Sequence, residues 1–304
     1  MDNYSAAVEN GKKKKGGVFE NIAFLIFTSL GLILLGQLLG TLLTAIFCGA
    51  FPQLGNDPAA VAATSYSPFV GIWILALIYF ACFKRTRPLF KAISCKVKGN
   101  NVKLLLLGLV VGLGLNLLCA FAAVLNGDIA LRFDSVRVGA LLIVFVFVFI
   151  QSAAEELLCR CYMFQPLLKR YGFMTAAIVN SVAFALLHIF NPGITVLALL
   201  NIALFGFLAS AVVYYWDSLW AAFAIHAAWN FCQNIILGLP NSGMPSAFSV
   251  YKLDAAAATN SFAYDVSFGI EGTVMACAVL LAASIAIVAL GRKKNAKPTE
   301  IYDV

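Results

Sequence analysis

Charged residues and histidines are scarce in this chain of 304 residues. Asp, Glu, Lys and Arg make up 12% of the sequence, hydrophobic residues make up 62%, and the two histidines are His188 and His226. A typical soluble domain is about half apolar and about a quarter charged, so this composition excludes one. The formal net charge of +7 does not indicate a nucleic-acid partner, because the basic residues lie between apolar runs and at the ends.

The sequence also lacks CxxC pairs and the HExxH motif of zinc proteases. Its eight cysteines fall mostly within or beside apolar runs, where cysteine behaves as a small hydrophobic residue. Cys159 and Cys161 flank Arg160 close to two carboxylates, so a redox or metal role stays open as an alternative to packing.

Long apolar runs are abundant, and the mean hydropathy is +0.91. A helix crosses a bilayer with about 20 apolar residues, so the sequence predicts an all-α polytopic membrane protein. About eight transmembrane helices are expected, at residues 22–48, 67–83, 104–125, 138–160, 173–191, 194–215, 218–238 and 268–291.

The basic residues orient these spans. All but three of the 21 Lys and Arg residues lie before the first span, between the second and third, after the fourth or after the last. Arg132, Arg137 and Lys252 fall on the other side. By the positive-inside rule both termini are cytoplasmic, and we expect a multi-pass protein of a cell membrane, namely a prokaryotic plasma membrane.

The fourth span carries two adjacent carboxylates, Glu155 and Glu156, followed by Arg160. Residues four apart share a helix face, so Glu156 can pair with Arg160, whereas Glu155 points about 100° away. A charge near the bilayer centre costs about 2.5–3.5 kcal/mol on insertion scales, and the pair offsets part of this cost. Glu155 is then the unexplained group, fit for proton exchange, although an interfacial salt-bridge cluster would also explain both acids.

The fifth span carries Phe184 and, four residues later, His188. If the fourth span continues to a turn at Tyr171-Gly172, Glu155 and His188 each lie 16 residues from that turn, about 24 Å along a helix. An antiparallel pair of helices therefore brings them to the same depth. We expect the fifth helix to end at residues 191–193, just beyond the histidine.

The seventh span carries His226 and Asn230, whose spacing of four places both on one helix face. Both can donate hydrogen bonds to an oxyanion that develops on a peptide carbonyl. They could equally act as polar contacts that hold membrane helices together.

Together, the EExxxR, FxxxH and HxxxN patterns across residues 138–238 resemble the three motifs of the CPBP family. These are the CAAX protease and bacteriocin-processing (Abi) intramembrane proteases, which include the type II CAAX prenyl proteases. The stretch Asp217-Ser218-Leu219-Trp220 resembles the turn that precedes the last motif. The resemblance implies an active site among spans four, five and seven.

The resemblance also implies roles for individual residues. Glu155 and His188 would activate a water molecule, with Glu155 as general base. His226 and Asn230 would stabilise the tetrahedral intermediate. Glu156 and Arg160 would be a supporting pair.

A divalent metal, most simply zinc, is the alternative to a metal-free mechanism. The family carries a metalloprotease label, and Glu155, Glu156, His188 and His226 are the candidate ligands. We expect no required cofactor, because Asn230 beside His226 suits an oxyanion donor better than a zinc ligand.

The expected partner is a membrane-associated protein or peptide substrate within the bilayer. CAAX-type cleavage and peptide or bacteriocin processing both remain open, as do a non-proteolytic immunity or scaffold protein of the same fold and a proton-coupled transporter. The expected organisation is given by ranges: a disordered basic tail at 1–17, N-terminal transmembrane helices at 18–137, the motif-bearing core at 138–238, an outer-face loop at 239–267, and the last helix with a basic tail at 268–304.

Overall fold

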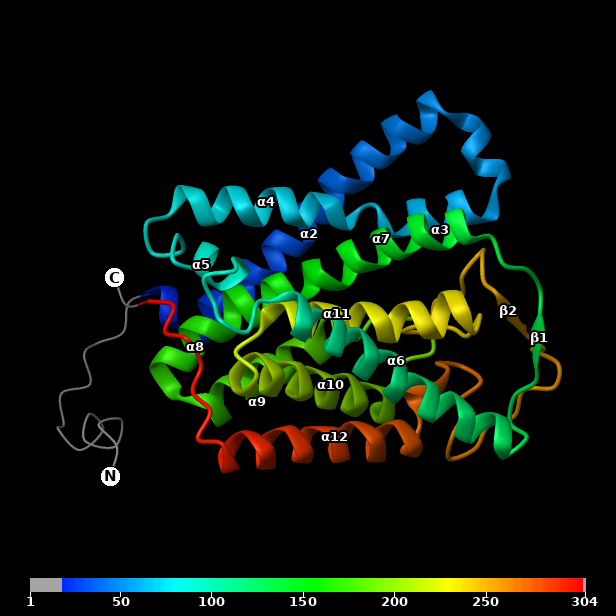
Figure 1. The fold of residues 1–304 in the computed structure, drawn as a ribbon. Helices are drawn as coiled ribbons and strands as arrows, with labels where there is room; N and C mark the ends of the chain where they lie inside the picture. Colours follow the sequence, from blue (N-terminus) through cyan, green and yellow to red (C-terminus); the bar gives the residue numbers. More distant parts are fainter. Residues whose placement is uncertain (1–17, 303–304) are drawn as a thin grey trace.

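The computed structural model describes residues 18–302, and these are mostly helical (Figure 1). The disordered tail expected at residues 1–17 lies outside the described residues. The longer helices are α2 (Ile22–Ala50), α3 (Pro58–Tyr66), α4 (Phe69–Cys82), α6 (Val102–Leu125), α7 (Val138–Glu156), α8 (Phe164–Tyr171), α9 (Phe173–Leu186), α10 (Val196–Tyr215), α11 (Leu219–Asn230) and α12 (Val274–Lys293). The short elements are η1 (Val18–Glu20), η2 (Pro52–Asn56), α5 (Leu89–Ile93), the π-helices η3 (Leu157–Met163) and η4 (Phe231–Ile236), η5 (Ile270–Gly272), and the strands β1 (Leu131–Phe133) and β2 (Tyr251–Leu253).

The polytopic helical class is confirmed, but eight spans are not. Within residues 18–302, six helical segments are long and apolar enough to cross a membrane: Ile22–Ala50, Pro58–Cys82, Val102–Leu125, Val138–Tyr171, Val196–Tyr215 and Val274–Lys293. The expected fifth span forms helix α9, and the expected seventh span forms α11 with its π-helical extension η4. Both are shorter than the six segments just named. The HxxxN motif lies on α11, and the FxxxH motif begins on α9 and ends at His188, just beyond that helix.

Polar side chains fix where several of the helices begin. The Asn101, Thr195, Ser218 and Thr273 side chains each accept a hydrogen bond from the backbone N–H three residues later. An N-cap of this kind satisfies one of the donors that the first helical turn leaves unpaired. Ser218 in this way sets the start of α11, eight residues before His226.

Helix α11 is the centre of the bundle, and every one of its residues except Trp220 is buried. It packs against α6, α7 and α10. Gly108 and Gly112 on α6 allow the closest of these contacts, since a Cβ at Gly112 would lie 2.9 Å from the Ala228 Cβ. Glycines four apart let membrane helices approach closely, so α6 supports the helix that carries His226 and Asn230.

The two ends of the bundle carry the two groups of basic residues that the sequence predicts on opposite faces of the membrane. At one end, Lys91 Nζ donates to the Glu300 carbonyl, and the Thr299 N–H and hydroxyl donate to the Asp217 carboxylate at 2.7 and 2.6 Å. At the opposite end, β1 and β2 form an antiparallel ribbon in which Arg132 faces Lys252 (Figure 1). Neither strand was expected, because strands of three residues give no readable alternation.

Candidate active site

The carboxylates Glu155 and Glu156 end α7, and the π-helix η3 follows directly. Single π-turns inside longer helices are often found at functional sites. Glu156 is fully buried, and the Glu155 side chain is 15% exposed. The helix therefore presents its two carboxylates to different surroundings, as their 100° separation predicts.

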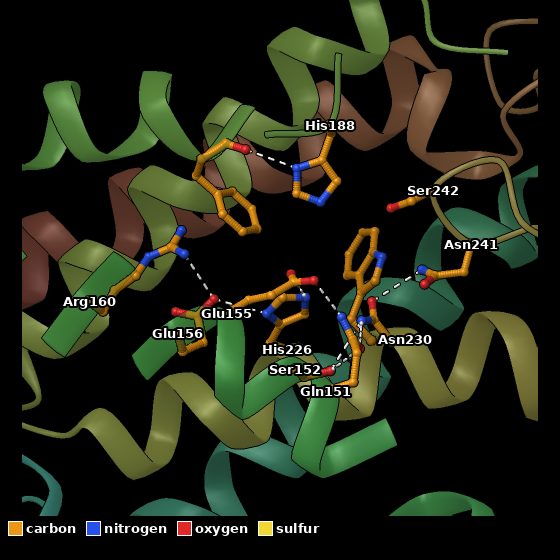
Figure 2. A network of polar contacts seen from close by, with 12 residues as sticks. Gln151, Ser152, Glu155, Glu156, Arg160, His188, His226, Asn230, Asn241 and Ser242 are labelled. Carbon is orange, nitrogen blue, oxygen red and sulfur yellow. Dashed lines mark hydrogen bonds and ion pairs between the residues drawn. The ribbon is translucent and has the colours of Figure 1, made fainter. Parts of the chain in front are cut away.

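Glu156 connects two of the three motifs (Figure 2). Its Oε1 accepts from Arg160 Nη1 at 2.9 Å and from His226 Nδ1 at 2.9 Å. The Arg160 contact has the i,i+4 spacing that the sequence predicts, and both side chains are fully buried. Since Glu156 is held beside a guanidinium, it is an acceptor, and Nδ1 of His226 carries a proton.

Nε2 of His226 faces the other carboxylate and lies 3.7 Å from Glu155 Oε2. This separation is longer than a hydrogen bond. Because Nδ1 donates to Glu156, Nε2 carries a proton only when the ring is an imidazolium.

The motif phenylalanine, Phe184, packs between the same groups. Its ring lies 4.3 Å from the Arg160 guanidinium carbon and makes edge contacts with His188 and His226, at centroid distances of 4.9 and 6.0 Å. A guanidinium over an aromatic face is attracted to the ring quadrupole, more so when water is excluded. Phe184 thus contacts all three motifs.

His188 lies in a turn, because α9 ends at Leu186 instead of reaching residues 191–193 as expected. Its side-chain Nδ1 lies 2.9 Å from the Phe184 carbonyl, which would accept the His188 N–H if the helix continued. The His188 N–H donates instead to Ala185 O at 3.0 Å. The side chain thus replaces the backbone donor and ends the helix, and it leaves Nε2 of the neutral ring as an acceptor.

Asn230 is joined to the carboxylate helix by its side-chain amide. Its Nδ2 donates to Gln151 Oε1 and to Ser152 Oγ, both at 3.1 Å. Gln151 in turn donates from Nε2 to Glu155 Oε1 at 2.7 Å. Both N–H bonds of Asn230 are therefore engaged within the protein, so donation to a substrate requires one of them to exchange partner.

A small cavity of about 30 Å³ joins the two histidines. His188, His226 and Asn230 line it, together with Phe184, Phe205, Trp229, Ser242 and Glu271 among others. A cavity of roughly 10–15 Å³ holds a water molecule that has polar partners. The cavity has room for water beside the imidazoles but none for a peptide.

The candidate metal ligands do not fit a metal centre. Within residues 18–302, no group of three or more His, Cys, Asp or Glu side chains is arranged to hold an ion. Glu156 Oε1 is already shared by the Arg160 cation and the Nδ1 proton of His226, which oppose a divalent cation at that oxygen. Cys159 and Cys161 are fully buried, consistent with the packing interpretation.

Sequence reasoning overlooked four residues of this site: Gln151, Ser152, Asn241 and Glu271. Gln151 and Ser152 lie four residues before Glu155 and Glu156, so their spacing in an apolar run was a readable signal. Glu271 was the one acidic residue in the expected last span, 268–291. Asn241 lies in a loop, where its position could not be read from periodicity.

Comparison with known proteins agrees with this core. Residues 137–232 match the family model described as type II CAAX prenyl endopeptidase Rce1-like. None of the curated proteins matches the chain.

Fold and match together describe a polytopic membrane protein in which residues 137–232 are similar to a family of proteases. The match confirms the CAAX-protease resemblance that the three motifs predict, over the segment that contains Glu155, His188, His226 and Asn230.

Proposed function

We propose that this protein is an intramembrane endopeptidase that hydrolyses peptide bonds of membrane-associated proteins or peptides. The observation that carries the proposal is the convergence of three separate helical segments on one buried cluster: Glu156 holds His226, Glu155 lies beside it, and His188 lines the same cavity. The two imidazoles line a cavity with room for water, and Glu155 lies beside one of them as a base; these are the groups that hydrolysis requires.

In the proposed reaction, Glu155 accepts a proton from water while the Nε2 lone pair of His188 orients the same molecule. The water oxygen attacks the scissile carbonyl and forms a tetrahedral intermediate. Glu155 then returns the proton to the leaving amine, and the products are a carboxylic acid and an amine. No step needs a metal ion.

The negative oxygen of the intermediate needs donors that are already in place. Nε2 of His226 supplies one when the ring carries a proton on both nitrogens, while Glu156 holds the ring in place through Nδ1. Asn230 supplies the second if one N–H leaves Ser152 or Gln151 for the oxyanion. Arg160 holds Glu156 in position and so acts through it.

Substrate must reach this site by separation of the elements around it, since the cavity holds water but not a peptide. The lining residues come from α9, α10, α11, α12 and the loop at Ser242. We place both termini at the cytoplasmic face, where nearly all the basic residues gather.

The test is cleavage of a membrane-anchored peptide library by the protein in liposomes, read by mass spectrometry. The Glu155→Gln, His188→Ala and His226→Ala variants should each lose about a hundredfold or more in kcat, the scale of general acid–base catalysis. Glu300→Gln is the matched control, because Glu300 is an exposed carboxylate outside the cluster, and it should cleave like the wild type. Cleavage that survives in Glu155→Gln refutes the proposal.

A further inference from the structure

Glu271 is the carboxylate that lines the cavity between the two histidines, and it belongs to none of the three motifs. It sits in η5, just before α12 begins. Oε1 accepts from Trp229 Nε1 at 3.0 Å and from Asn241 Nδ2 at 3.2 Å. Oε2 accepts from the Ser242 N–H at 2.6 Å. Donors that converge on both oxygens from two chain segments hold this carboxylate in one orientation.

Asn241 connects Glu271 to the HxxxN motif. Its Nδ2 donates to Asn230 Oδ1 at 3.1 Å (Figure 2). The same nitrogen donates to Glu271 Oε1. A side-chain amide nitrogen has two protons, and Asn241 uses one toward each acceptor. Reversal of the Asn241 amide would turn its oxygen toward two other oxygens, so Glu271 fixes which way Asn241 faces.

The hydrogen bonds continue in one direction from Asn241 to Glu155. Asn241 donates to Asn230, Asn230 donates to Gln151, and Gln151 donates to Glu155. A carboxylate lies at each end, and carboxylates only accept. The amides between them therefore cannot flip singly, and Asn230 Nδ2 is kept on the side of Gln151 and Ser152.

The loop that carries Asn241 is held in place at the same point. Ser242 adopts a positive φ of 48°, which is uncommon outside glycine and persists when neighbouring groups hold it. Its N–H is bound by Glu271, and its carbonyl accepts from Asn191 Nδ2 at 3.2 Å. Glu271 thus holds both the side chain of Asn241 and the backbone of the next residue.

We propose that Glu271 is a positioning residue of the candidate active site, which acts through Asn241 to fix the orientation of the Asn230 side-chain amide. Its effect on cleavage rests on the proposed endopeptidase function. Glu271→Gln replaces one acceptor oxygen with a donor, so either Asn241 or Ser242 meets a donor where it needs an acceptor. The amide of Asn230 then loses its fixed orientation.

The kinetic test compares Glu271→Gln, Asn241→Ala and the double variant in liposomes, with Asp254→Asn as the matched control. Asp254 is an exposed carboxylate in the loop before η5, and its variant should keep wild-type kcat. Each single variant should lower kcat by about tenfold, the cost of one lost hydrogen bond of about 1.4 kcal/mol, and leave KM within about twofold. The double variant should lose no more than the stronger single variant, because both act on Asn230.

A second readout does not depend on cleavage. The side-chain amide resonance of Asn230, assigned by its loss in Asn230→Ala, should move in Glu271→Gln and Asn241→Ala and stay unchanged in Asp254→Asn. Wild-type kcat in Glu271→Gln, multiplied effects in the double variant, or an unmoved Asn230 resonance overturns the inference. Cleavage that is abolished in Glu155→Gln but normal in Glu271→Gln would refute this role and leave the proposed function standing.

Discussion

His226 Nδ1 donates to Glu156 Oε1 at 2.9 Å although the two residues are 70 positions apart in the chain. The same oxygen accepts from Arg160, so one atom holds α7, η3 and α11 together. The contact explains why the two adjacent glutamates have different roles. Glu156 is hydrogen-bonded to Arg160 and His226, whereas Glu155 Oε2 lies 3.7 Å from the Nε2 atom of His226.

Loss of the Glu156 charge should destabilise the protein. Glu156→Gln leaves the fully buried Arg160 without its carboxylate, and the removal of one partner of a buried pair costs about 3–5 kcal/mol. Thermal unfolding in detergent should show a clear fall in Tm. The exposed pair of Asp57 and Arg137 offers the control, since Asp57→Asn should barely move Tm. An equal fall in Tm for Glu156→Gln and Asp57→Asn would contradict the stabilising role of the buried Glu156 carboxylate.

The close approach of α6 to α11 should be sensitive to a side chain at Gly112. In Gly112→Val, the added Cβ would collide with the Ile225 backbone carbonyl and lie 2.9 Å from the Ala228 Cβ. Overpacking costs about 1–3 kcal/mol, and a clash with backbone belongs at the upper end. We expect a lower Tm and a lower kcat, because the helix that carries His226 shifts. Gly114→Val, on the same helix with no atom within 4 Å of its Cβ position, should resemble the wild type.

Stability should depend on pH through Glu271. Burial raises the pKa of this carboxyl above its ordinary value of 4.5. The folded state therefore holds the proton more tightly than the unfolded state, and the contribution is fully present below pH 4.5 and is lost as the pH rises through the folded pKa. The difference in unfolding free energy between wild type and Glu271→Gln should follow that fall. A difference that is constant from pH 4 upward would contradict the raised pKa.

The C-terminal segment should loosen when Asp217 is neutralised. Asp217 has a positive φ of 53°, which Asn tolerates well, so Asp217→Asn removes charge and one acceptor without new backbone strain. Its two bonds from Thr299 are then weakened, and a glutamate-specific protease should cut after the neighbouring Glu300 faster. Thr299→Val removes the hydroxyl bond from the other side and should show the same change.

Cleavage should persist after exhaustive treatment with a metal chelator, because the proposed mechanism uses no metal. Elemental analysis of the purified protein before and after treatment is the check. Activity that falls with chelation and returns with added zinc would contradict the mechanism and make Glu155 and His188 the ligands to examine first.

The sequence was sufficient to predict the helical class, the three motifs and the Glu156–Arg160 pair, because each depends on local spacing along one helix. It did not predict that His188 ends α9, since this depends on the competition between one side-chain nitrogen and one backbone N–H for the Phe184 carbonyl. Nor did it predict that the Asn230 amide is bound by Gln151, Ser152 and Asn241, because these contacts depend on how the helices and the loop at residue 241 meet.

The π-helices have a consequence for changes in chain length. η3 begins after Glu156, inside the EExxxR motif, and η4 begins directly after Asn230, where the HxxxN motif ends, so the helix accommodates an additional residue at both places. Deletion of one residue within Phe231–Ile236 can be absorbed by a return to the tighter α-helical repeat, and His226 and Asn230 stay in register. Deletion of one residue between His226 and Asn230 would rotate the asparagine by about 100° and separate the pair. The chain should therefore tolerate shortening just after this motif and not within it.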